Sequence, residues 1–451
     1  MINLFEYQNK EPFNDDLDGL EAFLDDVWQK RDKVFYYYQN AQSRIESQRF
    51  LQFIHKSDEI KSNKYVGVIR YGDHKINLLP KIFFDQAKAY SSSDVSQIHL
   101  HLLWWLSYCR KIKFPSYLSA LGERENDFFE ILIYLFSKYT RELLGSMVFQ
   151  QYQEVDQEQS FIKGRLDTST YIRKNVGTGR WHKFSCTYDA FVIDNAFNRI
   201  VKYVTTMLFN ATSNQDNKKN LREILFILDE VSDERATTEQ CSKIKFNPMF
   251  EQFTTVRDYC QLFLSNSISF DYNNDLKLFA FLLPMEYVFE DFIYGFIEKE
   301  LPDVVAKSQR SDTNLDESGM FGLKPDLFIK TATRSIIADT KYKLVYTDAT
   351  DPKRGIGQQD LYQVVSYAIR FQTDQAILFY PDSVTSKNQP PTRIQVNDQL
   401  AGGIPIYIQA VQLPIINWEV LENQSKLKGS LQEVFQASSD NLRDKLRMII
   451  G

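Results

Sequence analysis

Apolar residues recur at helical spacing in four stretches of the chain. Residues 16–32 carry them on one side, which predicts a helix at the protein surface. Residues 96–109 and 126–148 are richer in apolar residues and predict two further helices. Residues 276–301 predict a long amphipathic helix that is either broken near Pro284 or begins there.

Shorter runs, in which apolar residues alternate with polar ones or form brief blocks, predict strands. Residues 64–82 contain two alternating runs around a Gly-Asp pair, which predicts a β-hairpin. Residues 323–344 contain two apolar runs and predict a second hairpin. A helix is expected at 358–371, then strands at 375–381 and 404–413 with a polar loop between them. The C-terminal third is therefore predicted to be an α/β unit with a small mixed sheet.

The middle of the chain is less regular. Residues 164–208 are punctuated by glycine and strand-like at first, and they become helical from Asn195 onward. Polar residues 210–220 are expected to join two helices. The predicted fold class is α+β with several domains. We expect an N-terminal β-containing domain, a mainly helical connector with a strand-like insertion, a C-terminal α/β domain and a helical tail, at 1–125, 126–275, 276–423 and 424–451.

Composition narrows the class of protein. A length of 451 residues predicts two or three domains, and 43% hydrophobic with 25% charged residues is ordinary for a globular chain. The four cysteines are scattered singly, which argues against a zinc site and a disulfide framework and favours a reducing cytoplasm. The start of the chain does not resemble a signal peptide, and the longest apolar stretch is too short to cross a membrane. We therefore expect a cytoplasmic protein without membrane association.

Charged residues in the second predicted hairpin suggest a site of chemistry. Asp326 follows a proline, while Asp339 and Lys341 flank Thr340 in the second apolar run. Because strand residues alternate between faces, Asp339 and Lys341 are expected on one face and Thr340 on the other. Paired carboxylates suit Mg²⁺ or Mn²⁺, and such a cation with a nearby lysine could hydrolyse a phosphodiester. The alternative is an ordinary hairpin whose strand ends and turns are charged.

Neighbouring residues favour the interpretation of this hairpin as a site that binds a cation and a phosphodiester. Glu286 and Glu290 are four apart and share a helical face, so a third acid could come from the preceding helix. Gln363 and Tyr367 lie one helical turn apart and could face the same site. The net charge is −6, yet residues 321–345 have five basic residues against two acidic ones: Lys324, Lys330, Arg334, Lys341 and Lys343.

Three other groups of residues have side chains that could carry chemistry. The segment containing Asp194 and Arg199 could be a second polar site, but a buried network with Asp194 as a helix cap is favoured. His99 and His101 are two apart on a predicted helix and therefore do not suit one metal ion. The loop at 347–357 contains Lys353 and Arg354, which could contact DNA or lie free in solvent.

Ordered sequence segments carry a family resemblance. "MEYVFEDFI", "KPDLFI", "IIADTKYK" and "DLYQVVSYA" follow one another in the C-terminal third. "GVIRYGDHKINLLPKI", "IKGRLD" and "CTYDAFVIDNAFNRIVK" precede them. Together they resemble the PD-(D/E)xK nuclease superfamily and, more closely, the McrC family, over roughly residues 60–410. McrC proteins are nuclease subunits of McrBC-type, modification-dependent restriction systems.

The resemblance implies roles for particular residues. Asp326, Asp339 and Glu290 would be metal ligands, and Lys341 would be the catalytic lysine. Gln363 matches the glutamine of the following helix, and Tyr367 gives it weaker support. Lys343, by contrast, is expected to be a DNA-facing or solvated charge.

The resemblance also implies a partner. It would be a McrB-like AAA+ GTPase hexamer that binds GTP, recognises modified double-stranded DNA such as DNA with methylcytosine, and docks on the N-terminal region. This chain has no GxxxxGK[ST] loop of its own, which agrees with GTP being bound by the partner. The family would place the chain in anti-phage defence.

Alternatives remain open at the level of sequence. The chain could be an adaptor and GTPase activator with an idle nuclease fold, or a stand-alone repair or structure-specific nuclease. LlaJI-like relatives are sequence-specific, so dependence on methylcytosine does not follow from the motif. Extra length before residue 60 and at 205–275 could adapt the chain to another partner or DNA modification.

Overall fold

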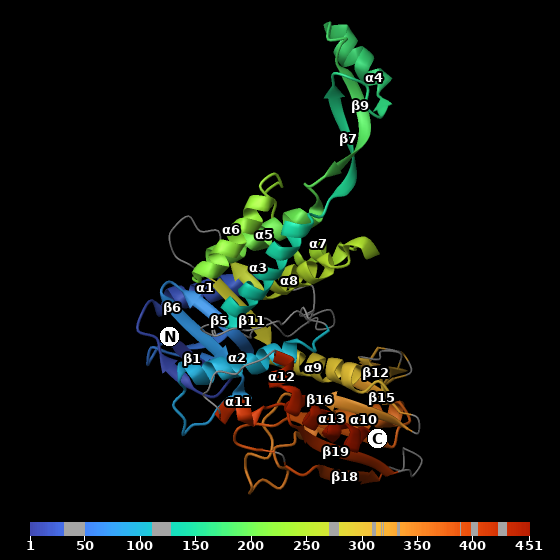
Figure 1. Ribbon diagram of the computed structural model, residues 1–451. Helices are drawn as coiled ribbons and strands as arrows, with labels where there is room; N and C mark the ends of the chain where they lie inside the picture. The colour runs from blue at the N-terminus through green and yellow to red at the C-terminus, as the bar shows by residue number, and fades with distance from the viewer. Residues whose placement is uncertain are drawn as a thin grey trace. The chain divides into compact units, whose positions relative to one another are not determined.

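The fold was analysed in a computed structural model of the chain. It describes residues 1–30, 50–110, 128–269, 279–308, 313–316, 318, 320–331, 334–387, 389–397, 405–422 and 431–451. The chain forms two compact units, a first of Met1–Leu132 with Ser265–Gly451 and a second of Ile133–Leu264. Helices alternate with several small sheets, as expected for a mixed α/β protein of several parts (Figure 1). The boundaries predicted at 125, 275 and 423 lie outside the described residues and remain predictions.

The first sheet of unit 1 has five strands in the order β1-β6-β5-β11-β10. β5 and β6 form the antiparallel hairpin that the sequence predicted, with Gly72 at positive φ in its turn. A Cβ at Gly67 would lie 1.9 Å from the Phe281 carbonyl oxygen, so only glycine fits where β5 meets β11. The strand bounds are Ile2–Phe5 (β1), Tyr65–Tyr71 (β5), His74–Leu79 (β6), Ser267–Ser269 (β10) and Phe279–Pro284 (β11).

One prediction for this region is wrong. The start of the stretch 276–301 was expected to be helical, but Phe279–Pro284 is strand β11, antiparallel to β5. Its residues 280–283 are all buried, and a short apolar run buried on both faces has no periodicity that separates strand from helix. Helix α9 (Met285–Glu300) begins directly after Pro284, as the alternative interpretation predicted.

Helix α1 and a three-stranded sheet complete the N-terminal part. α1 (Leu17–Lys30) confirms the helix predicted at 16–32, and it buries Leu20 and Leu24 against residues of β1 and β6. The small sheet has the order β2-β4-β3. Its strands are Lys10–Pro12 (β2), Leu51–Ile54 (β3) and Glu59–Ser62 (β4).

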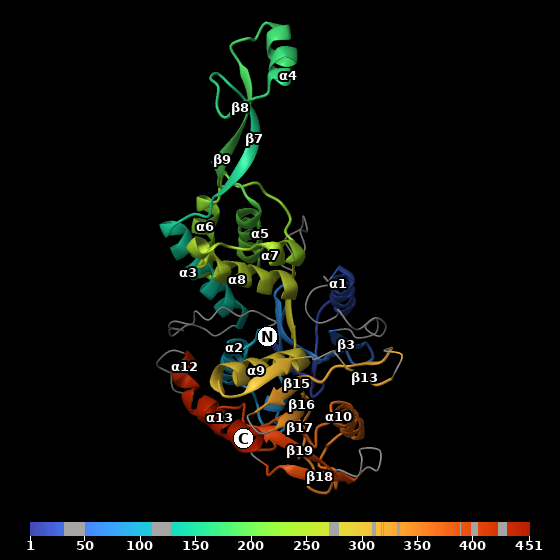
Figure 2. The same cartoon turned by 90° about the vertical axis from the view of Figure 1, so that its right-hand side faces the viewer.

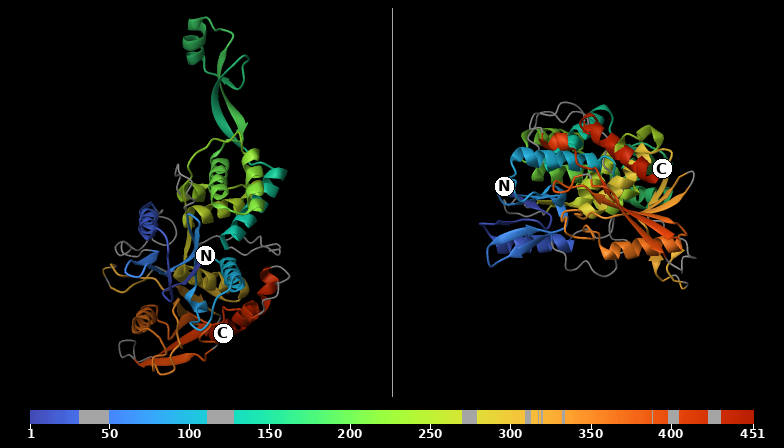
Figure 3. Two further views of the ribbon diagram at one scale, coloured as in Figure 1. Left: turned by 90° about the vertical axis from the view of Figure 1, so that its left-hand side faces the viewer. Right: turned by 90° about the horizontal axis from the view of Figure 1, so that it is seen from below.

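The second large sheet of unit 1 has six strands in the order β12-β15-β16-β17-β19-β18. The pairs β16-β17 and β17-β19 are parallel and the others antiparallel, so the predicted mixed sheet is confirmed. Helices α10 and α13 lie on opposite faces of this sheet (Figures 2 and 3). Their bounds are Val305–Ser308 (β12), Leu327–Lys330 (β15), Ser335–Thr340 (β16), Gln358–Arg370 (α10), Gln375–Pro381 (β17), Thr392–Asn397 (β18), Pro405–Leu413 (β19) and Gln436–Ile450 (α13).

Edge strand β18 was not predicted. Its sequence, TRIQVN, lies within the stretch expected to be a polar loop, yet it pairs with β19 along its whole length. An edge strand exposes one side to solvent and needs few apolar residues, so the hydrophobic pattern gives a weak signal. The helical tail is confirmed in its described part by α12 (Leu431–Val434) and α13.

Buried polar contacts join helix α2 (Ser92–Leu106) to the chain that follows β19. The Trp105 indole N–H donates to the Ile415 carbonyl at 3.1 Å, and the Asn417 amide donates to His101 Nε2 at 2.9 Å. His101 is therefore neutral with its proton on Nδ1, and burial lowers its pKa to about 4. Asp382, at the end of β17, accepts from the Ile415 amide at 3.0 Å.

Unit 2 is mainly helical with an inserted ribbon of strands. Figure 1 shows β7 and β9 as a long antiparallel pair extending from the helices of this unit. Residues 168–178 form short helical turns, although the sequence pattern there was strand-like. The elements are Phe128–Ser146 (α3), Gln151–Gln159 (β7), Arg165–Leu166 (β8), Phe184–Val192 (β9), Ala196–Ala211 (α5), Gln215–Ile227 (α6), Thr238–Lys243 (α7) and Phe253–Asn266 (α8).

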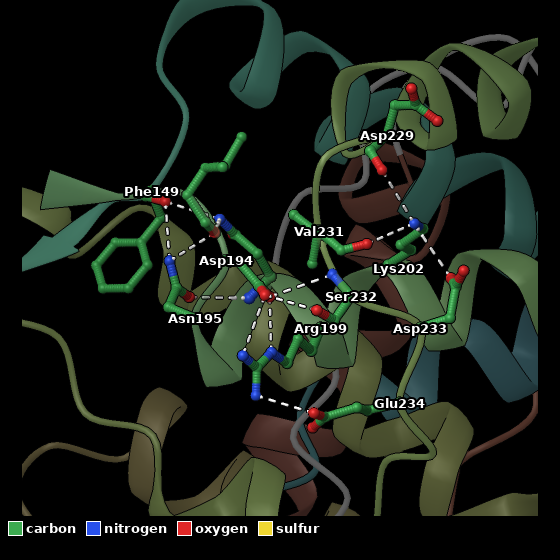
Figure 4. A network of polar contacts seen from close by, with 12 residues as sticks. Phe149, Asp194, Asn195, Arg199, Lys202, Asp229, Val231, Ser232, Asp233 and Glu234 are labelled. Atoms are coloured by element: carbon green, nitrogen blue, oxygen red, sulfur yellow. Dashed lines mark hydrogen bonds and ion pairs between the residues drawn. The ribbon is translucent and has the colours of Figure 1, made fainter. Parts of the chain in front are cut away.

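A polar network holds both ends of this ribbon on α5 (Figure 4). Asn198 Nδ2 donates to the carbonyls of Phe149, before β7, and Ile193, after β9, both at 2.7 Å. Asn195 is the N-cap of α5, so the expectation that Asp194 caps this helix is wrong. Asp194 instead accepts two hydrogen bonds from Arg199, at 2.6 and 3.1 Å, and these bonds lower its pKa. The network fixes the start of α5, and whether it also forms a second polar site remains a prediction.

In the part of the chain that the structure describes, no helix has both the length and the apolar character needed to cross a membrane.

Asp382 predicts that stability depends on pH. Burial raises its pKa from 3.8 to about 7, so its contribution to stability is complete below pH 4 and is lost as pH rises to 7. Asp382→Asn keeps an oxygen that can accept the same amide hydrogen bonds but carries no charge. At pH 8 we expect the variant to be more stable than the native chain by at most about 4 kcal/mol and so to unfold at a higher temperature, and the gap should shrink at pH 5. Thermal unfolding at both pH values measures this, and a variant less stable at pH 8 would contradict it.

Candidate active site

The hairpin of β15 and β16 brings two acidic residues to adjoining positions. Leu327 pairs with Ala338 in an antiparallel register, so Asp326 and Asp339 lie opposite each other at the end of the ladder. The predicted hairpin is thereby confirmed. β17 continues the sheet on the other side of β16, with Asp339 paired to Leu378.

Asp326 is held by Thr340. The Thr340 amide donates to Asp326 Oδ2 at 2.7 Å, and its hydroxyl donates to the same oxygen at 2.8 Å. Thr340 was expected to point away from the site, but it is the residue that fixes this carboxylate. The alternation of side chains along a strand did not predict this contact between Thr340 and Asp326. Asp326 precedes β15, so its side chain need not follow the alternation of that strand.

Asp339 is fully buried, at 0% exposed. Neither of its carboxylate oxygens accepts a hydrogen bond from any described residue. Lys341 Nζ lies 2.5 Å from Oδ2, and the two groups form an ion pair. The Lys341 backbone is fixed by its amide, which donates to the Phe379 carbonyl at 2.8 Å. A buried anionic oxygen without a hydrogen-bond donor is costly, and a cation would satisfy it.

The charges of these residues are strongly linked. Burial, followed by the charge of Asp339, raises the pKa of Asp326 to about 7. Burial alone would lower the pKa of Lys341, but Asp339 more than offsets this and raises it above its ordinary value. Lys341 therefore stays protonated at neutral pH. The site is two crowded carboxylates partly neutralised by one ammonium group.

Helix α10 supplies two polar side chains to the same place. Lys341 Nζ donates to Gln363 Oε1 at 3.0 Å, and Gln363 Nε2 donates to the Tyr367 hydroxyl at 2.8 Å. The Tyr367 hydroxyl in turn donates to the Lys324 carbonyl at 3.3 Å, just before Asp326. The structure thus joins all of these predicted residues in one chain of contacts.

The residues present fit a divalent cation. Mg²⁺ is commonly bound by one or two carboxylates with water and phosphate, and Asp326 and Asp339 offer such a pair. Among the described residues, no three His, Cys, Asp or Glu side chains lie close enough together to hold a metal ion. Glu290 is buried on α9, and its role as a third ligand remains a prediction.

The predicted DNA-contacting lysines and arginine are in different surroundings. Lys343 forms an ion pair with Asp360 at 2.8 Å while its side chain stays 49% exposed, and its expected role as a DNA-facing or solvated charge remains a prediction. Lys353 and Arg354 are exposed on the loop at 347–357, where Arg354 has positive φ. Their contact with DNA remains a prediction. Asp360 was missed because nothing in the sequence separates it from an ordinary acid in the first turn of a helix.

Fold and site together describe a multidomain α/β protein with two facing carboxylates, a lysine and a glutamine on a sheet hairpin and its covering helix. The family model for the "McrBC 5-methylcytosine restriction system component" matches residues 60–381. The chain therefore belongs to this family, and its resemblance to McrC is confirmed. No curated protein matches the chain.

Two solved structures from Thermococcus gammatolerans are similar. The first is a half-complex of McrB AAA+ hexamers with bound McrC, which matches with 19% identity and a TM-score of 0.64 and covers 100% of both chains. The second is the McrBC complex, with 21% identity and a TM-score of 0.48, covering 66% of this chain and 88% of that one. At this level of identity, the first match shows a shared fold.

Asp326→Asn should stabilise the metal-free protein. Its raised pKa means that the ionised carboxylate opposes folding above pH 7, whereas asparagine can still accept from Thr340. At pH 8 with a chelator we expect a gain of about 1–3 kcal/mol. Added MnCl₂ should raise the melting temperature of the native chain but not of the variant.

Asp374→Asn, which changes an exposed carboxylate before β17, provides the control. It should have the melting temperature of the native chain both with the chelator and with MnCl₂. A destabilised Asp326→Asn protein that still responds to MnCl₂ would contradict this account of the carboxylate pair.

Proposed function

We propose that this chain is the DNA endonuclease subunit of a McrBC-like restriction system and hydrolyses phosphodiester bonds with Mg²⁺. The observation that carries the proposal is that half-buried Asp326 and fully buried Asp339 lie opposite each other, with Lys341 paired to Asp339 and Gln363 hydrogen-bonded to Lys341. This set, on a hairpin followed by a helix, is the arrangement that the PD-(D/E)xK resemblance implies. Membership of the McrBC family supports DNA with 5-methylcytosine as the substrate and the cytoplasm as the location.

The side chains suggest a division of labour. Asp326 and Asp339 would hold Mg²⁺ or Mn²⁺, with Glu290 as a third candidate. When bound, the cation supplies positive charge that polarises the phosphate and favours the ionisation of water. Lys341, protonated and only 19% exposed, would offset negative charge on the phosphate during cleavage. Gln363 fixes the direction of this ammonium group through the 3.0 Å hydrogen bond.

A partner is part of the proposal. One similar structure contains McrB AAA+ hexamers with bound McrC, and this chain would join a McrB-like hexamer in the same way. The hexamer would bind and hydrolyse GTP and recognise modified double-stranded DNA. This chain would stimulate that GTP hydrolysis and cleave the DNA.

Unit 2 offers a surface for such a partner. We name the segment 160–181, between β7 and β9, the ribbon tip. It has several apolar side chains that are more than half exposed, an unusual feature for a protein surface that meets only water. They are Phe161, Ile162, Ile172 and Trp181. The ribbon tip therefore joins the N-terminal region as a candidate docking surface.

Substitution of the site separates cleavage from partner stimulation. Asp339→Ala and Lys341→Ala should each lower the cleavage of methylated plasmid DNA about 100-fold or more in the presence of partner, GTP and Mg²⁺. Stimulation of GTP hydrolysis should stay within about twofold, because the site is not a docking surface. Gel assays of DNA nicking and phosphate-release assays measure the two activities.

Each alternative has its own outcome in this experiment. Variants that cut at the native rate would refute the site assignment. A native chain that stimulates GTP hydrolysis but never cuts DNA would indicate an adaptor. A native chain that cuts without partner or GTP would indicate a stand-alone nuclease.

Substitution of the ribbon tip should instead lower the stimulation of partner GTP hydrolysis. Trp181→Ser removes a large exposed ring and should reduce the stimulation of partner GTP hydrolysis about 10-fold, without a change in melting temperature. Phe226→Ser provides the matched control, because Phe226 is an even more exposed ring of the same unit, on α6. Equal effects of the two substitutions would count against a docking role for the ribbon tip.

A further inference from the structure

A second ion pair lies beside the candidate site. Lys343 Nζ contacts both carboxylate oxygens of Asp360, at 2.8 and 2.9 Å. The Tyr380 hydroxyl donates to Asp360 Oδ2 at 3.3 Å. Asp360 is 4% exposed and Tyr380 is fully buried. The carboxylate is thus held from two sides by residues of different elements.

Space around this pair is tight. A Cβ at Gly357 would lie 2.8 Å from Asp360 Oδ2 and 3.5 Å from Lys343 Nζ. Gly357 precedes α10 directly, with φ of −71°, so a side chain there would be opposed by the nearby Asp360 carboxylate and not by the backbone angle. The start of α10 is therefore packed onto the pair.

The ion pair of Lys343 and Asp360 lies next to the contact between Lys341 and Gln363. Lys343 is two residues beyond Lys341, and its amide donates to the Lys341 carbonyl at 2.8 Å. On α10, Gln363 follows Asp360 by three residues, so both lie on one face of the helix. Two lysines from the end of β16 thus reach two polar residues on successive turns of the same helix.

We propose that Lys343 and Asp360 are positioning residues that fix α10 against the hairpin, so that Gln363 meets Lys341. The proposal rests on the proposed nuclease function and adds to it two residues that do not touch the reacting atoms. A buried carboxylate is stable only when paired, so the start of α10 is fixed where Lys343 can reach it. An error of about 1 Å in placing Gln363 would turn the Lys341 ammonium away from the phosphate.

A direct contact between Lys343 and DNA is the competing role, since the lysine side chain is 49% exposed. The two roles differ in kinetics. Loss of a phosphate contact weakens DNA binding and raises KM, whereas loss of positioning lowers kcat. They also differ in structure, because only positioning requires the start of α10 to loosen.

The test compares Lys343→Met and Asp360→Asn with Lys343→Arg in the full chain. With partner, GTP, Mg²⁺ and methylated plasmid DNA, the first two should lower kcat about 10- to 100-fold and leave KM within about twofold. Lys343→Arg preserves the ion pair and should retain most activity. Gly357→Ala, which displaces the Asp360 carboxylate, should resemble Asp360→Asn.

Hydrogen exchange of residues 358–363 provides a readout that needs no cleavage. Lys343→Met and Asp360→Asn should speed exchange there about 10-fold or more, whereas Lys343→Arg should not. Lys10→Met provides the control, because it breaks an ion pair of 2.6 Å with Glu59 in the N-terminal sheet. If Lys343→Met does not fold, the double variant with Asp360→Asn removes both charges and leaves no unpaired carboxylate.

Unchanged exchange in folded variants would overturn the proposal, as would a raised KM with unchanged kcat. A native chain that never cuts DNA would instead refute the proposed function, and exchange would still decide whether the pair fixes α10.

Discussion

The structure depends on the confinement of two like charges. Asp326 and Asp339 lie opposite each other at one end of a hairpin, and burial, followed by the charge of Asp339, raises the pKa of Asp326 to about 7. Neighbouring groups offset the cost of these two negative charges in part. Thr340 donates two hydrogen bonds to Asp326, and Lys341 forms an ion pair with Asp339. The compensation is incomplete, because the oxygens of Asp339 accept no hydrogen bond from the described residues. A divalent cation would complete it.

The rest of unit 1 keeps this arrangement in place. The parallel pairing of β16 with β17 buries Asp339, and α10 covers one face of the same sheet with Val364 and Ala368. The chain after β19 is tied to α2 by Trp105 and His101, so the C-terminal sheet is anchored to the N-terminal part of the same unit. The carboxylate pair at the hairpin is thus held in place by ordinary apolar packing around it.

The sequence predicted the elements whose signals are local. Both hairpins, α1, α2, α3 and α10 followed from periodicity, and the set Asp326, Asp339, Lys341 and Gln363 followed from motif order. Strand β11 could not be recognised, since a short apolar run buried on both faces has no distinctive period. The contacts of Thr340 with Asp326, and of Lys343 with Asp360, depend on how distant segments meet, and no local pattern encodes that.

The central claim is that the carboxylate pair binds a divalent cation, and diffraction from crystals soaked in MnCl₂ tests it most directly. The account predicts an anomalous difference peak within about 2.5 Å of carboxylate oxygens of both Asp326 and Asp339. A peak elsewhere, with the hairpin carboxylates left without metal at saturating Mn²⁺, would contradict it.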